Sequence, residues 1–157
     1  MKSKSSSRHS SGFGLIEVMV AILVLSIGFL GLAGMVVRSL STNGTAMARS
    51  VATVAAYSIQ DAMRADRTNA ANGSYNGTVT ASSCSIGTGS VAQLQLGQWC
   101  AELSNPVLNG ATAATGVVQC TNIGMNSVCM VTISWDDSRN GTVSGSTTQT
   151  VTTVGML

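Results

Sequence analysis

Apolar residues fill one long stretch near the start of the chain, GFGLIEVMVAILVLSIGFLGLAGMVV from Gly12 to Val37. Residues 18 to 37 carry no charge, and a helix rising about 1.5 Å per residue would cross a hydrocarbon core of about 30 Å over that length. The pattern therefore predicts a membrane-spanning helix. Glu17 fits a plain anchor poorly, because an unpaired carboxylate costs about 2.5 to 3.5 kcal/mol near the bilayer centre.

Beyond Val37 the sequence becomes amphipathic. Apolar side chains recur at helical spacing from Met47 to Met63, and the other faces carry Arg49, Gln60, Asp61 and Arg64. We expect one long helix from about Phe13 to about Arg67, whose second half covers a sheet. Asp61 and Arg64 are three residues apart and form an expected surface pair.

The remainder of the chain predicts a small domain of mixed structure. Residues 69 to 88 are rich in Asn, Gly, Ser and Thr and predict a connecting loop, held down by Tyr75. A short helix is expected over residues 90 to 104, ended by Asn105 and Pro106.

Strands are expected after this short helix. Residues 116 to 120 and 128 to 135 are β-rich and are separated by the polar segment TNIGMNS, which predicts a hairpin. Residues 136 to 142 contain an Asn-Gly turn signal, and the threonine-rich residues 147 to 154 predict a third strand at an edge. The expected fold class is α+β, with a long N-terminal helix packed on a small antiparallel sheet of about three or more strands.

Charge is distributed unevenly along the chain. Three of the eight Lys and Arg residues, Lys2, Lys4 and Arg8, precede Gly12, which leaves five cations against six carboxylates, or −1. The basic character thus belongs to the leader, and we expect no nucleic-acid partner. Leader cations instead favour a cytoplasmic N-terminus and a C-terminal part on the other side of the membrane.

The four cysteines, Cys84, Cys100, Cys120 and Cys129, all lie in the C-terminal part. An even number in a small exported domain indicates disulfides. Cys120 and Cys129 lie on the two arms of the predicted hairpin and could close it, which would leave Cys84 to pair with Cys100. The crossed and nested connectivities stay open. No metal site is expected, because no CxxC pair and no nearby histidine is present.

The order of basic leader, Gly12, Phe13, Gly14, Leu15, Ile16, Glu17 and apolar run resembles the class III signal of type IV pilins and type II secretion pseudopilins. Gly14 departs from the threonine common at that place. The resemblance implies that a prepilin peptidase cuts between Gly12 and Phe13 and methylates the new amino group of Phe13. The ammonium could then pair with Glu17 of an adjoining subunit, which would set axial register. The alternative is a signal anchor whose Glu17 reaches the membrane interface.

Further segments are similar to the PilV group of minor pilins, also called type IV pilus modification proteins. They include VLSIGFLGLAGM, AYSIQDAMRADR and VTISWDDSRNG. The resemblance implies a minor pilin that primes pilus assembly and stays near the tip, with the major pilin, other minor pilins and a large tip adhesin as partners. It implies a single-pass protein of the bacterial inner membrane with a periplasmic domain, later found in the pilus and needed for twitching motility.

The expected parts are a leader (1–12), a transmembrane or filament-core half of the helix (13–37), its amphipathic half (38–67), and a globular part (68–157). Gly28, Gly31 and Gly34 each cost about 1 kcal/mol relative to alanine in a helix interior. They could form a small-residue packing face, soften the helix on leaving the bilayer, or simply be tolerated.

Catalysis is not expected, and neither is a cofactor. The only histidine is His9 and the only lysines are Lys2 and Lys4, so cleavage would remove the groups used in triads and Schiff bases. Asp136 and Asp137 are adjacent and are expected to shape a turn, with a calcium site as the alternative. Type II secretion pseudopilins of the I class, and a monomeric signal-anchored periplasmic binding domain, are the alternative functions.

Overall fold

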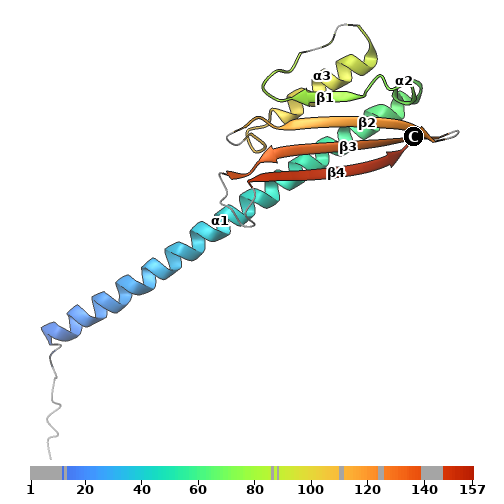
Figure 1. Cartoon of the computed structure of the whole chain (residues 1–157). Coiled ribbons are helices and arrows are strands. Elements are labelled where there is room, and N and C mark those ends of the chain that lie inside the picture. The colour runs from blue at the N-terminus through green and yellow to red at the C-terminus, as the bar shows by residue number, and fades with distance from the viewer. Residues whose placement is uncertain are drawn as a thin grey trace, which may run out of the picture. The chain divides into compact units, whose positions relative to one another are not determined.

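The computed structural model describes residues 12, 14–85, 87, 89–109, 112–123, 126–138 and 147–157. Within these residues the elements, in chain order, are α1 (Leu15–Ala65), α2 (Arg67–Ala71), β1 (Gly77–Thr80), α3 (Val91–Leu103), β2 (Thr115–Ile123), β3 (Asn126–Asp136) and β4 (Thr148–Met156) (Figure 1). The chain divides into two compact units, Met1–Ser39 and Leu40–Leu157. The first unit contributes the beginning of α1, and the second contains the sheet.

The sheet has the strand order β1-β2-β3-β4, and every neighbouring pair is antiparallel. Figure 1 shows the second half of α1 lying across one face of it. A helix packed on a small antiparallel sheet was predicted from the sequence, and the α+β class is confirmed. The threonine-rich strand β4 lies at an edge, as its composition predicted.

Alanines let α1 approach the sheet closely. The helix buries Ala48, Ala52, Ala55, Ala56, Ile59 and Met63. Alternate residues of β3, among them Val131, Ile133 and Trp135, face this stripe and are buried as well. Small side chains bring the helix backbone near the strands, while the larger strand residues fill the remaining space. This contact is the main core of the second unit.

Helix α3 closes the core from the side of β1 and β2. The indole Nε1 of Trp99 donates a hydrogen bond to the carbonyl oxygen of Ala55, 2.8 Å away, although that carbonyl lies within α1. Gly116 on β2 gives the ring its space, because a Cβ added there would lie 2.4 Å from Cη2 of Trp99. The ring therefore joins α1, α3 and β2.

The predicted loop over residues 69 to 88 was partly wrong. Helix α1 ends at Ala65 rather than near Arg67, α2 follows, and Gly77–Thr80 form strand β1. Backbone pairing with β2 maintains this strand even though both Gly77 and Thr78 are exposed. The hydrophobic pattern could not reveal it, because a four-residue edge strand needs few apolar side chains. Tyr75 does hold the segment down, and its ring is fully buried.

The predicted hairpin is present, with longer arms than expected. Strand β2 continues to Ile123 and β3 begins at Asn126, so the polar residues on both sides of residues 124 and 125 take part in the ladder. Backbone hydrogen bonds do not require apolar side chains, which explains the underestimate. The Asn-Gly turn signal at residues 140 and 141 lies outside the described residues. The short helix matches its expected bounds within one residue, and Ser90 Oγ caps it by accepting from the N–H of Gln93 at 3.3 Å.

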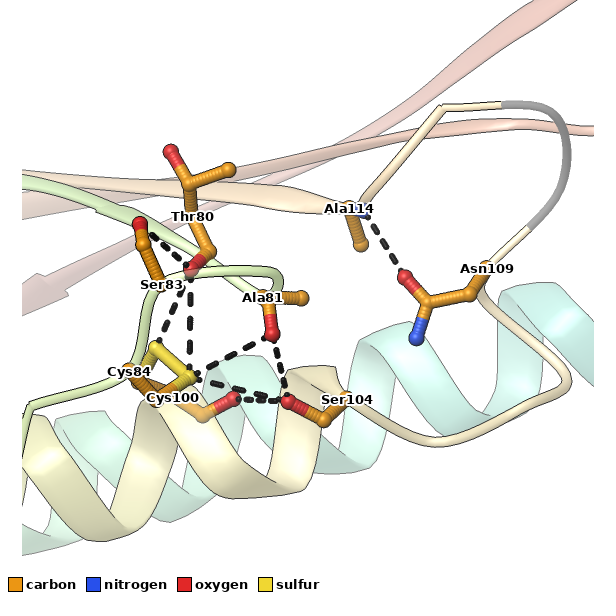
Figure 2. Close-up of a disulfide and its surroundings, with 8 residues drawn as sticks. All are labelled: Thr80, Ala81, Ser83, Cys84, Cys100, Ser104, Asn109 and Ala114. Carbon is orange, nitrogen blue, oxygen red and sulfur yellow. Dashed lines mark hydrogen bonds between the residues drawn. A yellow bond between two sulfur atoms is a disulfide. The ribbon is translucent and has the colours of Figure 1, made fainter.

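Two disulfides hold the second unit, with the pairing that the sequence favoured. Cys120 and Cys129 face each other directly across the β2–β3 ladder, with Cα atoms 4.0 Å apart. Cys84 pairs with Cys100 and ties the segment after β1 to α3, with Cα atoms 5.5 Å apart (Figure 2). The two sulfurs lie 3.8 and 3.4 Å from the carbonyl oxygen of Thr80. The second disulfide thus rests against the end of β1.

Candidate processing and assembly site

The start of α1 holds the residues that the signal motif singled out. Gly12 and Gly14 are described, whereas Phe13, the expected cleavage and methylation position, lies outside the described residues. The carbonyl oxygen of Gly14 accepts hydrogen bonds from the N–H groups of Glu17 at 3.0 Å and Val18 at 3.3 Å. The helix therefore begins at Leu15, immediately after this short segment.

Glu17 lies in the first turn of α1, where a negative charge is favoured by the partial positive charge of the helix N-terminus. Its side chain is exposed, and no described residue forms an ion pair with it. Together with Val18, Ala21, Ile22 and Leu25 it lines a shallow groove on one face of the helix. The site is thus a single carboxylate at the end of an apolar groove.

The apolar stretch after Glu17 is entirely uncovered within the first unit. All residues from Leu15 to Leu40 are exposed, including Phe29 at 63% and Leu30 at 75%. By length and composition α1 could cross a membrane. An apolar surface of this extent is stable only in a lipid environment or against other apolar helices. The surroundings of this first part of α1 must therefore come from outside the chain.

The three glycines of this stretch lie in unbroken helix. A Cβ added at Gly28, Gly31 or Gly34 would meet nothing within 4 Å. No contact inside the chain therefore requires glycine at these positions. Close packing against another helix and softening of α1 both remain predictions, because each concerns surroundings that the isolated chain does not include.

Residues 7–33 match the family model described as the prokaryotic N-terminal methylation motif. The motif supports a type IV pilin-like protein. It implies processing by prepilin peptidase and assembly with other pilins, and it favours a structural subunit over an enzyme. With the long apolar helix, it fits membrane anchoring followed by incorporation in a pilus. No curated protein and no solved structure shows significant similarity to this chain.

The carboxylates outside the motif have structural contacts. Asp136 accepts hydrogen bonds from the N–H and the hydroxyl of Ser138, both at 3.0 Å, so it shapes the turn after β3 as predicted. Asp137 accepts from the hydroxyl of Thr45 on α1 at 2.7 Å. Among the residues that the structure describes, no three His, Cys, Asp or Glu side chains cluster in a way that could hold a metal ion.

Sequence reasoning missed two polar residues that organise the second unit. The expectation that Gln60 lies away from the apolar face of α1 was wrong. Its side chain is buried, because its Nε2 donates to Thr153 Oγ1 on β4 at 3.1 Å and so has a partner there. The side chain of Asn76 pairs with the backbone of Cys120, accepting at 2.7 Å and donating at 3.3 Å, and so continues the ladder beyond β1. Gln60 could have been found, because it lies one turn from the buried Ala56 and Met63. Asn76 carried no such signal.

Proposed function

We propose that this chain is a minor pilin of the PilV group, which co-assembles with other minor pilins to prime type IV pilus assembly and stays near the tip. The observation that carries the proposal is Glu17, a carboxylate without a described ion-pair partner in the first turn of an exposed apolar helix and within the residues that match the methylation motif. Such a helix requires apolar surroundings, and such a carboxylate requires a cation.

Cleavage between Gly12 and Phe13 would provide that cation. The new ammonium of Phe13 would lie one helical turn from Glu17 of its own chain, so in a bundle of parallel helices it can also reach Glu17 of an adjoining subunit. A buried carboxylate without a partner is strongly unfavourable, whereas a paired one is tolerated. Pairing between subunits would therefore relieve the cost of Glu17 when the subunits are in the correct axial register.

The PilV assignment rests on the segments VLSIGFLGLAGM, AYSIQDAMRADR and VTISWDDSRNG. The first lies within α1, the second runs from α1 to the first residue of α2, and the third begins in β3 and extends beyond the described residues. These segments support a minor pilin more than a major pilin. A large tip adhesin and the other minor pilins are the partners that follow from the assignment, and the second unit would contact them on the periplasmic side and later at the tip.

A type II secretion pseudopilin is the second candidate, because the same N-terminal motif is found in that class. A deletion strain distinguishes the two functions. Loss of twitching with normal enzyme secretion would support the pilus assignment, whereas loss of secretion with normal twitching would refute it. Complementation with the full-length chain controls for effects on neighbouring genes.

A monomeric signal-anchored binding domain is the remaining alternative. Intact mass measurement of the protein extracted from cell membranes tests it directly. We expect a chain that begins at Phe13 and carries one additional methyl group. Retention of residues 1 to 12 would refute the pilin assignment as a whole, because an uncleaved leader leaves no ammonium to pair with Glu17.

A further inference from the structure

Strand β4 has backbone groups that no other strand uses among the residues that the structure describes. It pairs with β3 over its whole length, from Thr148 opposite Asp136 to Met156 opposite Val128. The flanking bonds, from Asp137 N–H to the Thr147 carbonyl and from Leu157 N–H to the Ser127 carbonyl, show that odd-numbered residues bond to β3. In an antiparallel ladder the bonding direction alternates. The N–H and C=O groups of Thr150, Thr152, Val154 and Met156 therefore point away from the sheet, along its open edge.

The sequence of β4 offers none of the usual protection of an edge strand. Exposed edges commonly carry a charged residue, a proline or a bulge, or are very short, which prevents pairing with another chain. Strand β4 reads TQTVTTVGM, without charge or proline, and its nine residues keep one continuous register with β3. It is therefore a long and regular pairing edge.

The opposite edge of the sheet, formed by β1, differs from β4 in its length and in the contacts of its last residue. Strand β1 has only four residues, and the carbonyl oxygen of Thr80 already accepts a hydrogen bond from the N–H of Ser83 at 2.9 Å. The disulfide between Cys84 and Cys100 rests against the same carbonyl, as Figure 2 shows. One edge is short and covered at its end, and the other is long and open over the residues that the structure describes.

On the sheet face away from α1, the side chains of β4 are uncharged. Thr150 and Thr152 lie on the sheet face away from α1 and contact Ser134 and Thr132 of β3, each pair at 3.3 Å between oxygens. Further along the same face Val154 is 64% exposed and Met156 is 69% exposed. This strip changes from hydroxyl groups at one end to apolar groups at the other.

We propose that β4 accepts an extended strand from a neighbouring, different subunit, which adds a fifth strand to the sheet. The incoming segment needs free backbone groups over at least four residues and uncharged side chains on the face shared with Thr152 and Val154, since a charge there would lose water without gaining a partner. The neighbour follows from the proposed function, in which subunits stand side by side in one assembly.

A second copy of this chain fits the edge less well. The bonds from Arg49 to Gln149 at 2.7 Å and from Gln60 to Thr153 at 3.1 Å show that β4 and the second half of α1 run in the same direction. A twofold pair of β4 strands would be antiparallel and would point those helix segments in opposite directions. Subunits inserted side by side in one membrane with the same topology have helices pointing the same way.

Substitutions at Thr152 test the edge in the full-length chain, produced in its own bacterium lacking the chromosomal copy. Thr152→Pro removes one outward N–H that β3 does not use, and Thr152→Lys keeps the N–H but adds a charge. Thr152→Ala is the matched control, since it also loses the hydroxyl contact with Thr132. Gln119→Lys adds the same charge to an exposed position on β2 of the same face, away from the edge.

The amount of each variant in sheared pili, measured relative to its amount in the membrane, is the first readout. We expect Thr152→Pro and Thr152→Lys to fall about fivefold or more, the factor that one lost hydrogen bond represents, and the two controls to match the wild type. Equal recovery of all four variants would overturn the proposal. If the Thr152→Pro chain does not accumulate in the membrane, or lacks one of the two disulfides, it has not folded. The recovery of Thr152→Lys in sheared pili then tests the proposal alone.

A photo-cross-linking residue, p-benzoylphenylalanine, at position 150 gives a readout that does not depend on pili. We expect a membrane adduct with another pilin, mapped by mass spectrometry to an extended segment, and its loss in the Thr152→Lys background. If this adduct forms but the chain never enters pili, the result would refute the proposed function and support strand addition at β4. An adduct only between two tagged copies of this chain, or no adduct, would overturn the edge proposal.

Discussion

Gly116 tests how tightly β2 packs against α3. A Cβ added at this position would lie 2.4 Å from Cη2 and 2.8 Å from Cζ3 of Trp99, and 2.7 Å from Cδ1 of Leu103. The end of Leu103 can rotate, but the indole ring is fixed by its hydrogen bond to the carbonyl of Ala55. Gly116→Ala therefore forces the ring to move, although alanine itself is acceptable in a strand.

Three contributions decide the size of the effect. Overpacking a core by one methyl group costs about 1 to 3 kcal/mol. Moving the ring of Trp99 breaks its bond to Ala55 and leaves a buried indole N–H unsatisfied, at about 1 to 3 kcal/mol. Replacing glycine by alanine within a strand returns about 0.5 to 1 kcal/mol. The balance is a loss of about 3 kcal/mol in the free energy of unfolding.

Urea unfolding of the full-length chain in detergent, followed by tryptophan fluorescence, measures this loss, because the chain has only two tryptophans. We expect the midpoint to fall by about 1 M or more, given a slope of about 1 to 3 kcal/mol per M. Gly31→Ala is the control, since its Cβ would meet nothing. In a Trp99→Phe background, which lacks Cη2 and Cζ3 of the indole, Gly116→Ala should cost much less. Equal costs in both backgrounds would refute the steric explanation.

The remaining predictions concern processing, the second disulfide and alkaline pH. Glu17→Ala should still be cleaved and methylated but should be absent from sheared pili, and normal incorporation would refute the pairing with Phe13. Replacing Cys84 and Cys100 together by serine should lower the free energy of unfolding by about 3 kcal/mol, as expected for a loop of 16 residues; an unchanged urea midpoint would contradict this. Burial, then the hydrogen bond and charge of Asp66, raise the pKa of Tyr75 to about 12 from its ordinary 10, which favours the neutral phenol in the folded state. Its contribution of about 2 to 3 kcal/mol is fully present below pH 10 and is lost as the pH rises to about 12. The urea unfolding midpoint should fall between pH 10 and pH 12 in the wild type and in Tyr57→Phe, whose ring is half exposed. The fall should be absent in Tyr75→Phe, and its persistence there would contradict this explanation.

The sequence predicted those elements whose hydrophobic pattern matches their surroundings. The second half of α1 alternates buried and exposed positions at helical spacing, and β3 does so at strand spacing, so both were found with nearly correct bounds. β1 was missed because its neighbours supply the pairing, and its own four residues bury little. The side chain of Asn76 acts on the backbone of Cys120, 44 residues away, and no local pattern predicts a contact of that kind.

The candidate site was predictable for a different reason. Its residues are consecutive, so the order of glycine, phenylalanine and glutamate before an apolar run is visible without a fold. What the sequence could not provide was the state of Glu17 in the folded chain, where the carboxylate is exposed and has no described ion-pair partner. Stability within the chain therefore does not explain this residue.

The two units differ in what stabilises them, and this difference bears on assembly. The second unit has its own core of α1, α3 and the sheet, with two disulfides. In the first unit, none of the apolar side chains from Leu15 to Val37 is buried. A folded second unit alone gives no reason to keep Glu17, because the carboxylate contributes nothing to that core. In the proposed pilus the ammonium of Phe13 from an adjoining subunit would offset the cost of burying Glu17, so the proposal predicts that this residue is favourable in an assembly and unfavourable for a solitary anchor.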